Sequence, residues 1–270
     1  MRVLVVNDLS CVGKCSLSVS LPIISSCGVT CDVLPTAILS THTGGFEGYT
    51  FRDLTSDFDG ILKQWKTLSL KFDVIYSGYL GSIDQIELVQ KMKEEFLVDG
   101  GKLIVDPVMG DGGKLYKGFT DEFVEKMKTL CTAADYILPN RTEACALTGL
   151  PYPQTDGETL ARALTSLCKR PIVTGILEQT DISVYYATDD GEVEKYTSKN
   201  VDGFFCGAGD VFASAFVGAL ARGKSEETAI RLAADFTNAA CRRSAKEVLD
   251  KRYGLNFEVE ILPFLKKLND

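Results

Sequence analysis

The sequence predicts an α/β protein, a doubly wound and mostly parallel sheet with helices on both faces. First, short apolar runs alternate with longer amphipathic stretches, which is the pattern of strands joined by crossover helices. Second, the apolar runs are short and bounded by turn-forming residues, as buried strands are. Third, 45% hydrophobic and 24% charged residues in a chain of 270 are typical of a globular protein.

The predicted elements follow one another along the chain as strands and helices. The expected buried strands are Arg2–Val6, Val29–Leu34, Phe72–Ser77, Lys102–Val105, Tyr136–Leu138 and Pro171–Thr174. The expected amphipathic helices between them are Leu54–Leu68, Ile83–Leu97, Phe119–Leu130 and Leu160–Leu167. Strands that alternate with helices need right-handed crossovers, and these place the strands parallel in one sheet.

The last third of the chain departs from this alternation. Ser183–Ala187 and Glu192–Thr197 flank Asp189–Asp190–Gly191, the turn signature of a hairpin, so we expect an antiparallel addition to the parallel sheet. Helical patterns then cover Asp210–Ala221, Glu226–Arg243 and about Val259–Leu268. No linker, charge block or repeat divides the sequence, so residues 1–270 are interpreted as one domain.

Charge and cysteine content narrow the function classes. The formal net charge is −8, and a field of that sign repels phosphate backbones, which argues against a nucleic-acid partner. No apolar run approaches the ~18 residues that a membrane span needs, and MRVLVVND has the pattern of a strand rather than of a signal peptide. The nine cysteines contain no C-x-x-C pair and are typical of a reducing compartment. We therefore expect a cytoplasmic protein without a membrane partner.

Two common catalytic patterns are missing or incomplete. His42 is the only histidine and no G-x-S-x-G motif accompanies it, so hydrolysis through a Ser–His triad is disfavoured. The loop Ser10–Ser16 contains Gly13–Lys14, but a Walker loop would need glycine at position 8 and Ser or Thr at position 15. The chain has Asp8 and Cys15 there, so this interpretation is rejected.

A second glycine-rich motif, Gly207–Ala208–Gly209–Asp210, opens the apolar helix VFASAFVGAL. A dinucleotide fingerprint would require a third glycine at position 212, which is Phe, and a place after the first strand. Small residues at a helix N-terminus let backbone N–H groups converge on an anion. Asp210 beside them either acts on a substrate or is a plain cap that binds the amides of its own helix. The local pattern leaves both open.

Acidic and amide side chains follow two further predicted strands. Asp106 and Asp111 lie in DPVMGDGG just past the strand KLIV, where they suit Mg²⁺ and phosphate or form a solvated turn. Asn140 and Glu143 come after the strand YIL, where they form a pair related to the capping box or hold a hydrated metal. Ligands of doubly wound sheets bind beyond the carboxyl ends of the strands, so we expect these groups along one edge.

Together these motifs resemble the ribokinase-like superfamily, and within it the pyridoxal kinases, above all the bacterial pyridoxal/pyridoxamine kinase group. The resemblance covers nearly the whole chain, and its most specific stretches are Leu39–Gly44, Ser77–Ser82, Asp106–Asp111, Asn140-x-x-Glu143 and Gly207–Asp210. It implies ATP-dependent phosphorylation of the 5′-hydroxymethyl group of a vitamin B6 vitamer (pyridoxal, pyridoxamine or pyridoxine), with Mg²⁺, in pyridoxal 5′-phosphate salvage. The family is often dimeric, so the resemblance also implies a homodimer.

The resemblance also implies roles for single residues of this chain. Asp210 would be the general base, and the anion hole for the γ-phosphate would be formed by the backbone amides of Gly207, Ala208 and Gly209. The nucleotide phosphates and the metal would be held, directly or through water, by Asp106, Asn140 and Glu143, with Asp111 as a further candidate metal ligand and Thr174 lining the nucleotide site. The pyridine ring would be bordered by Asp8, Thr43 and Tyr79.

Two positions depart from the family pattern. Asp8 stands where pyridoxal kinases usually have Ser, which favours a cationic vitamer such as pyridoxamine but is also similar to the hydroxymethylpyrimidine kinases. Those relatives usually end the anion-hole motif in Cys, whereas this chain has Asp210. Leu138 stands where the family often has Thr, so a side-chain ligand for a monovalent cation is missing and dependence on such an ion is doubtful.

Other functions remain open. One is a hydroxymethylpyrimidine or sugar kinase of the same fold, and another is a nucleotide-binding module without turnover. The second is disfavoured because a pure binding module gains nothing from an acid that faces phosphate. The segment Ser40–Gly48 carries three glycines after a strand and is predicted to be a mobile cover that excludes water from the acceptor. Within it, we expect His42 to be a structural hydrogen-bonding residue rather than a base.

Overall fold

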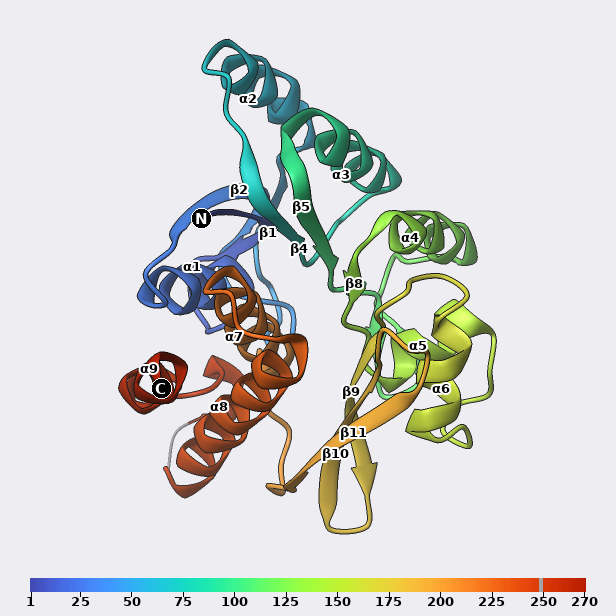
Figure 1. Ribbon diagram of the computed structural model, residues 1–270. Helices are drawn as coiled ribbons and strands as arrows, with labels where there is room; N and C mark the ends of the chain where they lie inside the picture. The colour runs from blue at the N-terminus through green and yellow to red at the C-terminus, as the bar shows by residue number, and fades with distance from the viewer. Residues whose placement is uncertain (248–249) are drawn as a thin grey trace.

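A six-stranded sheet runs through the computed structural model, which describes residues 1–247 and 250–270 (Figure 1). In spatial order its strands are β3 (Phe51–Asp53), β2 (Thr30–Leu39), β1 (Arg2–Ser10), β4 (Phe72–Ser77), β5 (Leu97–Val105) and β8 (Tyr136–Ile137). Neighbouring strands are parallel except β2 and β3, which are antiparallel. The carboxyl ends of β1, β4, β5 and β8 therefore share one edge, as the predicted parallel sheet requires.

A second sheet is antiparallel and contains β9 (Ile172–Glu178), β10 (Asp181–Ala187) and β11 (Val193–Lys199). The predicted hairpin is confirmed as β10 and β11. The hairpin adds antiparallel to β9, which contains most of the predicted strand Pro171–Thr174, but β9 lies in the second sheet rather than in the predicted parallel one. Among the described residues, isolated parallel bridges from Ile137 to Pro171 and from Asn140 to Thr174 connect β9 to the main sheet. Since β8 is two residues long, it is too short for a continuous ladder.

Helices cover both faces of the main sheet, which confirms the predicted fold class (Figure 1). On one face lie α1 (Leu17–Ser26), α7 (Ala208–Ala221), α8 (Glu226–Lys246) and α9 (Ile261–Asn269), the last after short 3₁₀ turns at Lys251–Tyr253 and Glu258–Glu260. On the other lie α2 (Thr55–Thr67), α3 (Ile83–Phe96) and α4 (Asp121–Ala133), followed by α5 (Arg141–Thr148) and α6 (Gly157–Leu164) beside the second sheet. A small hairpin of β6 (Gly110–Asp111) and β7 (Lys114–Leu115) precedes α4. None of the helices described here has the length and apolar character of a membrane-crossing segment.

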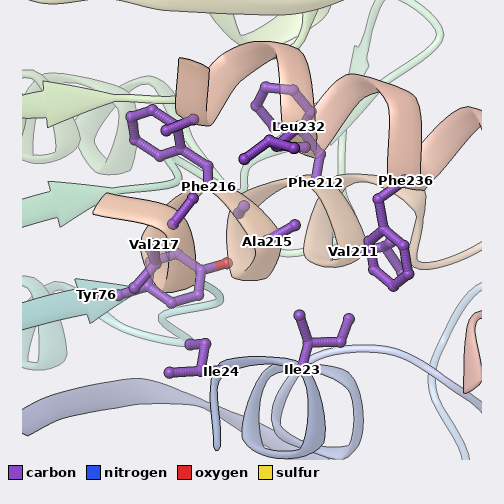
Figure 2. Packing of buried hydrophobic residues seen from close by; sticks show 14 of the residues in the cluster. Ile23, Ile24, Tyr76, Val211, Phe212, Ala215, Phe216, Val217, Leu232 and Phe236 are labelled. Atoms are coloured by element: carbon purple, nitrogen blue, oxygen red, sulfur yellow. The ribbon is translucent and has the colours of Figure 1, made fainter. Parts of the chain in front are cut away.

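The core on the α7 face joins the elements that carry the predicted site. Figure 2 shows Tyr76 of β4 with Ile23 and Ile24 of α1 and with Phe216 and Val217 of α7, and all five side chains are fully buried. Full burial of one large apolar side chain contributes ~1.5–3 kcal/mol. This packing holds α7 against β4 and α1, so the first turn of α7 keeps a fixed place at the carboxyl edge of the sheet.

The helix α1 is missing from the predicted elements. Its sequence, LSVSLPIISS, is mostly apolar and contains Pro22, so it lacks the amphipathic periodicity on which the helix predictions depend. The helix forms because its apolar side chains are buried against β1 and α7. It begins after Ser16, whose backbone has a φ of 53°, an uncommon conformation for a residue other than glycine.

Candidate active site

The first turn of α7 is shaped by two glycines with different surroundings. Gly207 has a φ of 76°, and a Cβ built on it would lie 2.2 Å from the carbonyl oxygen of Lys14, so no other residue fits without displacing that loop. A Cβ on Gly209 would meet no atom within 4 Å. An open space therefore lies beside the first turn of α7, and a helix N-terminus favours a bound anion. In the structure the N–H of Ala208 donates to the carbonyl of Phe205 at 3.4 Å.

Asp210 is partly buried in this first turn and is held by groups from other elements. Asn7 Nδ2 donates to its Oδ1 at 3.4 Å, and the backbone of Ser16 lies near the carboxylate. Burial raises the pKa of Asp210 to about 6, with a smaller contribution from the nearby charge of Asp8. Within the described part of the chain, no hydrogen bond joins an α7 amide to this carboxylate, and the cap position is Gly207. The interpretation of Asp210 as a plain helix cap is therefore wrong.

Asp8 is buried at the carboxyl end of β1 among hydroxyl groups. Ser10 Oγ donates to its Oδ2 at 3.2 Å, and the side chain of Ser16 lies nearby. Burial raises the pKa of Asp8, and these hydroxyls and the nearby His42 oppose that shift. The partly buried Tyr79 lies close enough for the charge of Asp8 to contribute, after burial, to raising the tyrosine pKa to about 12. Asp8 and Tyr79 are neighbours in the structure, because both of their backbone N–H groups donate to Asn7 Oδ1.

The loop after β2 carries His42 and Thr43. The ring of His42 is buried, with Nδ1 accepting from the backbone N–H of Gly44 at 3.1 Å and Nε2 lying 2.6 Å from the carbonyl oxygen of Arg252. Both ring nitrogens are therefore engaged with backbone groups, which agrees with the structural role expected for His42. Thr43 is exposed beside it, and no described side-chain contact joins it to Asp8 or Tyr79.

Asn140 and Glu143 form a complete capping box at the start of α5. Asn140 Oδ1 accepts from the Glu143 N–H at 3.0 Å, and Glu143 Oε2 accepts from the Asn140 N–H at 2.9 Å. The pair also holds the loop after β5, because Glu143 Oε1 accepts from the N–H of Met109 at 3.0 Å and Asn140 Nδ2 donates to the carbonyl of Gly110 at 2.8 Å. The capping alternative for this pair is therefore confirmed.

Asp106 is buried at the carboxyl end of β5, next to Glu143. Its carboxylate accepts no hydrogen bond from any described residue, and burial together with the charge of Glu143 raises its pKa. Burial likewise raises the pKa of Glu143. No ion pair among the described residues includes Asp106, Glu143, Asp210 or Asp8. Burial of these carboxylates without a basic partner therefore favours their protonated forms, which is the direction of both pKa shifts.

The remaining predicted residues lie at the margin of this cluster. Asp111 is exposed, and its Oδ1 accepts from the N–H of Gly112 at 2.7 Å, as in the solvated turn weighed for it. Within residues 1–247 and 250–270, no three or more His, Cys, Asp or Glu side chains come together as a metal cluster, so a site of three converging carboxylates does not form. Thr174 is partly buried in β9, and its N–H donates to the carbonyl of Pro139 at 2.9 Å.

Sequence reasoning missed three residues that contact the acids, namely Asn7, Ser10 and Ser16. One signal could have indicated Asn7, because an amide that ends an otherwise apolar strand is placed where doubly wound sheets bind ligands. A cavity of about 750 Å³ lies elsewhere, between β11 and α8, and none of the predicted site residues lines it. Its lining includes Lys199, Asn238 and Arg242.

Comparison with known proteins agrees with this fold and site. The sequence model of the phosphomethylpyrimidine kinase family matches residues 21–254. A pyridoxine kinase of Bacillus subtilis is 30% identical over 202 residues, which are 70% of this chain and 71% of that protein. The crystal structure of a pyridoxal kinase from Lactobacillus plantarum is 32% identical, covers 98% of this chain and 96% of its own, and superposes with a TM-score of 0.92.

A Bacteroides thetaiotaomicron protein that carries the same family name, crystallised with pyridoxal, is 35% identical. The match covers 97% of this chain and 95% of that one, with a TM-score of 0.91. The family match includes Asp106 and Asp210 but begins after Asp8, and the structural likenesses extend over nearly the whole chain. The resemblance to the pyridoxal kinases is thereby confirmed, and the chain belongs to the phosphomethylpyrimidine kinase family, a group of ribokinase-like kinases that transfer a phosphoryl group to an alcohol.

Proposed function

We propose that this kinase phosphorylates the 5′-hydroxymethyl group of a vitamin B6 vitamer with ATP. The observation that carries the proposal is the position of Asp210, partly buried at the open N-terminus of α7 and 3.4 Å from Asn7 at the end of β1. The relatives named as pyridoxal and pyridoxine kinases, and the one crystallised with pyridoxal, support the choice of acceptor.

In this proposal Asp210 takes the proton of the acceptor hydroxyl while the oxygen forms a bond to the γ-phosphorus of ATP. The bond between that phosphorus and the β–γ bridging oxygen breaks, ADP leaves, and the proton is later released to water. A pKa of about 6 leaves most of the Asp210 carboxylates ionised at pH 7, so the residue is ready to act as a base. The N–H groups of Gly207, Ala208 and Gly209 stabilise the charge on the transferred phosphoryl group.

The carboxylates of Asp106 and Glu143, which follow β5 and β8, suit Mg²⁺, because this ion prefers carboxylate, water and phosphate oxygens. Asp106 is the principal candidate ligand, since its carboxylate has no other described partner. Glu143 already accepts two backbone N–H groups and would act through water. Mg²⁺ bound with ATP would neutralise phosphate charge near these acids. Asn140 fixes the geometry of both loops, and Thr174 borders the nucleotide.

On the acceptor side, Asp8 and Tyr79 border the ring, and Thr43 lies in the covering loop Ser40–Gly48. A buried carboxylate at position 8 favours a cationic vitamer, so we propose pyridoxamine as the preferred substrate. We also propose that residues 1–270 act as one kinase domain in the cytoplasm. All nine cysteines are free in the structure, which supports a reducing compartment. A homodimer is part of the same proposal and depends on the family resemblance alone.

A hydroxymethylpyrimidine kinase is the second candidate, because the family model that matches the chain is named for the related phosphomethylpyrimidine kinases and Asp8 fits that group. ADP release should be measured with pyridoxal, pyridoxamine, pyridoxine, hydroxymethylpyrimidine and a sugar panel, and the products identified by mass spectrometry. We expect phosphorylated vitamers at rates at least tenfold above the other acceptors. A preference for hydroxymethylpyrimidine would select the second candidate. ATP binding without ADP release for every acceptor would indicate a module without turnover.

A further inference from the structure

Asn7 is a fully buried polar residue in the carboxyl-terminal half of β1, directly after the four apolar residues Val3–Val6. Its Oδ1 accepts two backbone N–H groups, from Tyr79 at 2.8 Å and from Asp8 at 3.0 Å. Two donors at one atom identify that atom as the carbonyl oxygen, so the amide nitrogen must point the other way. There Nδ2 donates to Oδ1 of Asp210 at 3.4 Å, across 203 residues of sequence.

The amide of Asn7 is also fixed by its packing against Gly78. A Cβ built on Gly78 would lie 2.2 Å from Asn7 Nδ2 and 2.5 Å from its Cγ, so the amide occupies the space of the missing side chain. The N–H of Gly78 donates to the carbonyl of Val6 at 2.9 Å, which keeps this contact in place. The amide therefore cannot swing away from Asp210 unless β1 and β4 move apart.

We propose that Asn7 is a positioning residue for the phosphoryl transfer, which fixes the plane of the Asp210 carboxylate so that its remaining lone pairs face the acceptor hydroxyl. This inference rests on the proposed role of Asp210 as the base. A carboxylate that can rotate about its Cβ–Cγ bond spends little time in the reactive geometry, and small misplacements of a reacting group cost large factors in rate. Among the described residues, Asn7 supplies the one side-chain hydrogen bond that reaches this carboxylate.

A merely structural role for Asn7 can be separated from a positioning role with Thr36. Thr36 Oγ1 donates to the carbonyl of Tyr79 at 3.0 Å, so it stabilises the same loop after β4 as Asn7 does. Thr36 is fully buried and, among the described residues, has no hydrogen bond to Asp210. Thr36→Val is therefore a matched control that removes support for the loop and leaves the base untouched.

The experiment compares Asn7→Asp and Gly78→Ala with Thr36→Val. Asn7→Asp keeps an acceptor for the two backbone N–H groups but replaces the donor to Asp210 by an oxygen that repels it. Gly78→Ala leaves Asn7 in the sequence and displaces its amide. We expect kcat to fall about ten- to a hundredfold in Asn7→Asp and ~10-fold in Gly78→Ala. The KM of the acceptor and the Kd of ATP should stay within about threefold, and Thr36→Val should keep its kcat. Equal losses of kcat in Asn7→Asp and Thr36→Val would overturn the proposal.

A double-mutant cycle with Asp210→Asn tests whether Asn7 acts through the base. If it does, Asn7→Asp should change the residual rate of Asp210→Asn by less than about threefold, because groups that act as one unit are not additive. Full additivity would overturn the positioning role. The cycle is run with the acceptor that the wild type phosphorylates fastest, so an error in the vitamer assignment leaves it intact. If Asp210→Asn alone keeps the wild-type kcat, Asp210 is not the base. This single variant therefore tests the proposed function separately from the role of Asn7.

Discussion

Replacement of Asp210 by Asn tests the centre of the proposed mechanism. The two side chains have the same shape, and the asparagine oxygen can still accept from Asn7 Nδ2, so the first turn of α7 should be preserved. Loss of a general base typically lowers kcat by ~10²–10⁴-fold. The backbone N–H groups of α7 are unchanged, so the Kd of ATP should stay within about twofold. ADP formation, followed by chromatography, and ATP titration calorimetry give the two quantities.

The pH dependence makes this prediction sharper. With a pKa of about 6, Asp210 is about nine-tenths ionised at pH 7 and about one-tenth ionised at pH 5, so kcat/KM of the wild type should fall roughly tenfold between them. This acid limb should be absent from Asp210→Asn. Activity of the variant within about threefold of wild type, with the acid limb retained, would refute the role of Asp210 as base.

Stability gives an independent check, because the pKa of Asp210 is raised from 3.8 to about 6 in the folded protein. The folded state then binds the proton more tightly, so Asp210 contributes less stability as pH rises from about 4 to 6. Above that pH range the ionised Asp210 lowers the free energy of unfolding by on the order of 1–3 kcal/mol, since one pKa unit corresponds to about 1.4 kcal/mol. Asp210→Asn should therefore melt at or above the wild-type temperature at pH 8. A clear decrease would indicate a structural role.

Three further predictions concern other parts of the site. Asp8→Ser should lower the ratio of kcat/KM for pyridoxamine to kcat/KM for pyridoxal roughly ten- to a hundredfold, because a charge-assisted hydrogen bond is lost. If the ratio does not change, Asp8 does not select the substrate, whatever happens to the absolute rates. Gly207→Ala should lower both the melting temperature and kcat, since its Cβ would lie 2.2 Å from the Lys14 carbonyl oxygen. The control Gly209→Ala should melt like the wild type, because its Cβ would meet no atom within 4 Å. Equal melting temperatures of the two variants would contradict the steric argument. Burial raises the pKa values of Asp106 and Glu143, so the folded protein without Mg²⁺ binds more protons than the unfolded chain and should lose stability as pH rises above their ordinary values. The melting temperature of Glu143→Gln should decrease less between pH 5 and 8 than that of the wild type. The same decrease in both proteins would contradict the raised pKa values of Asp106 and Glu143.

Local periodicity was sufficient to predict many of the elements. The strand Phe72–Ser77 is found with its predicted bounds, and Asp210–Ala221 lies within α7 and ends with it. Such agreement follows because a buried strand or an apolar helix needs its apolar residues at fixed spacing wherever it packs. The method fails for α1, where an almost continuous apolar run with Pro22 has no spacing to detect, and only burial against β1 and α7 makes it a helix.

The sequence by itself determined that the candidate residues follow strands, and strand and helix alternation predicts that such residues lie along one edge of the sheet. Only the tertiary structure decided how those residues meet. The order β2-β1-β4-β5-β8 brings Asn7 to Asp210 across 203 residues and places Lys14 against Gly207. It also surrounds Asp8 with serines and leaves the Asp106 carboxylate without a described partner. Periodicity reports how each segment is buried, whereas contacts between segments depend on strand order and packing, which no local pattern encodes.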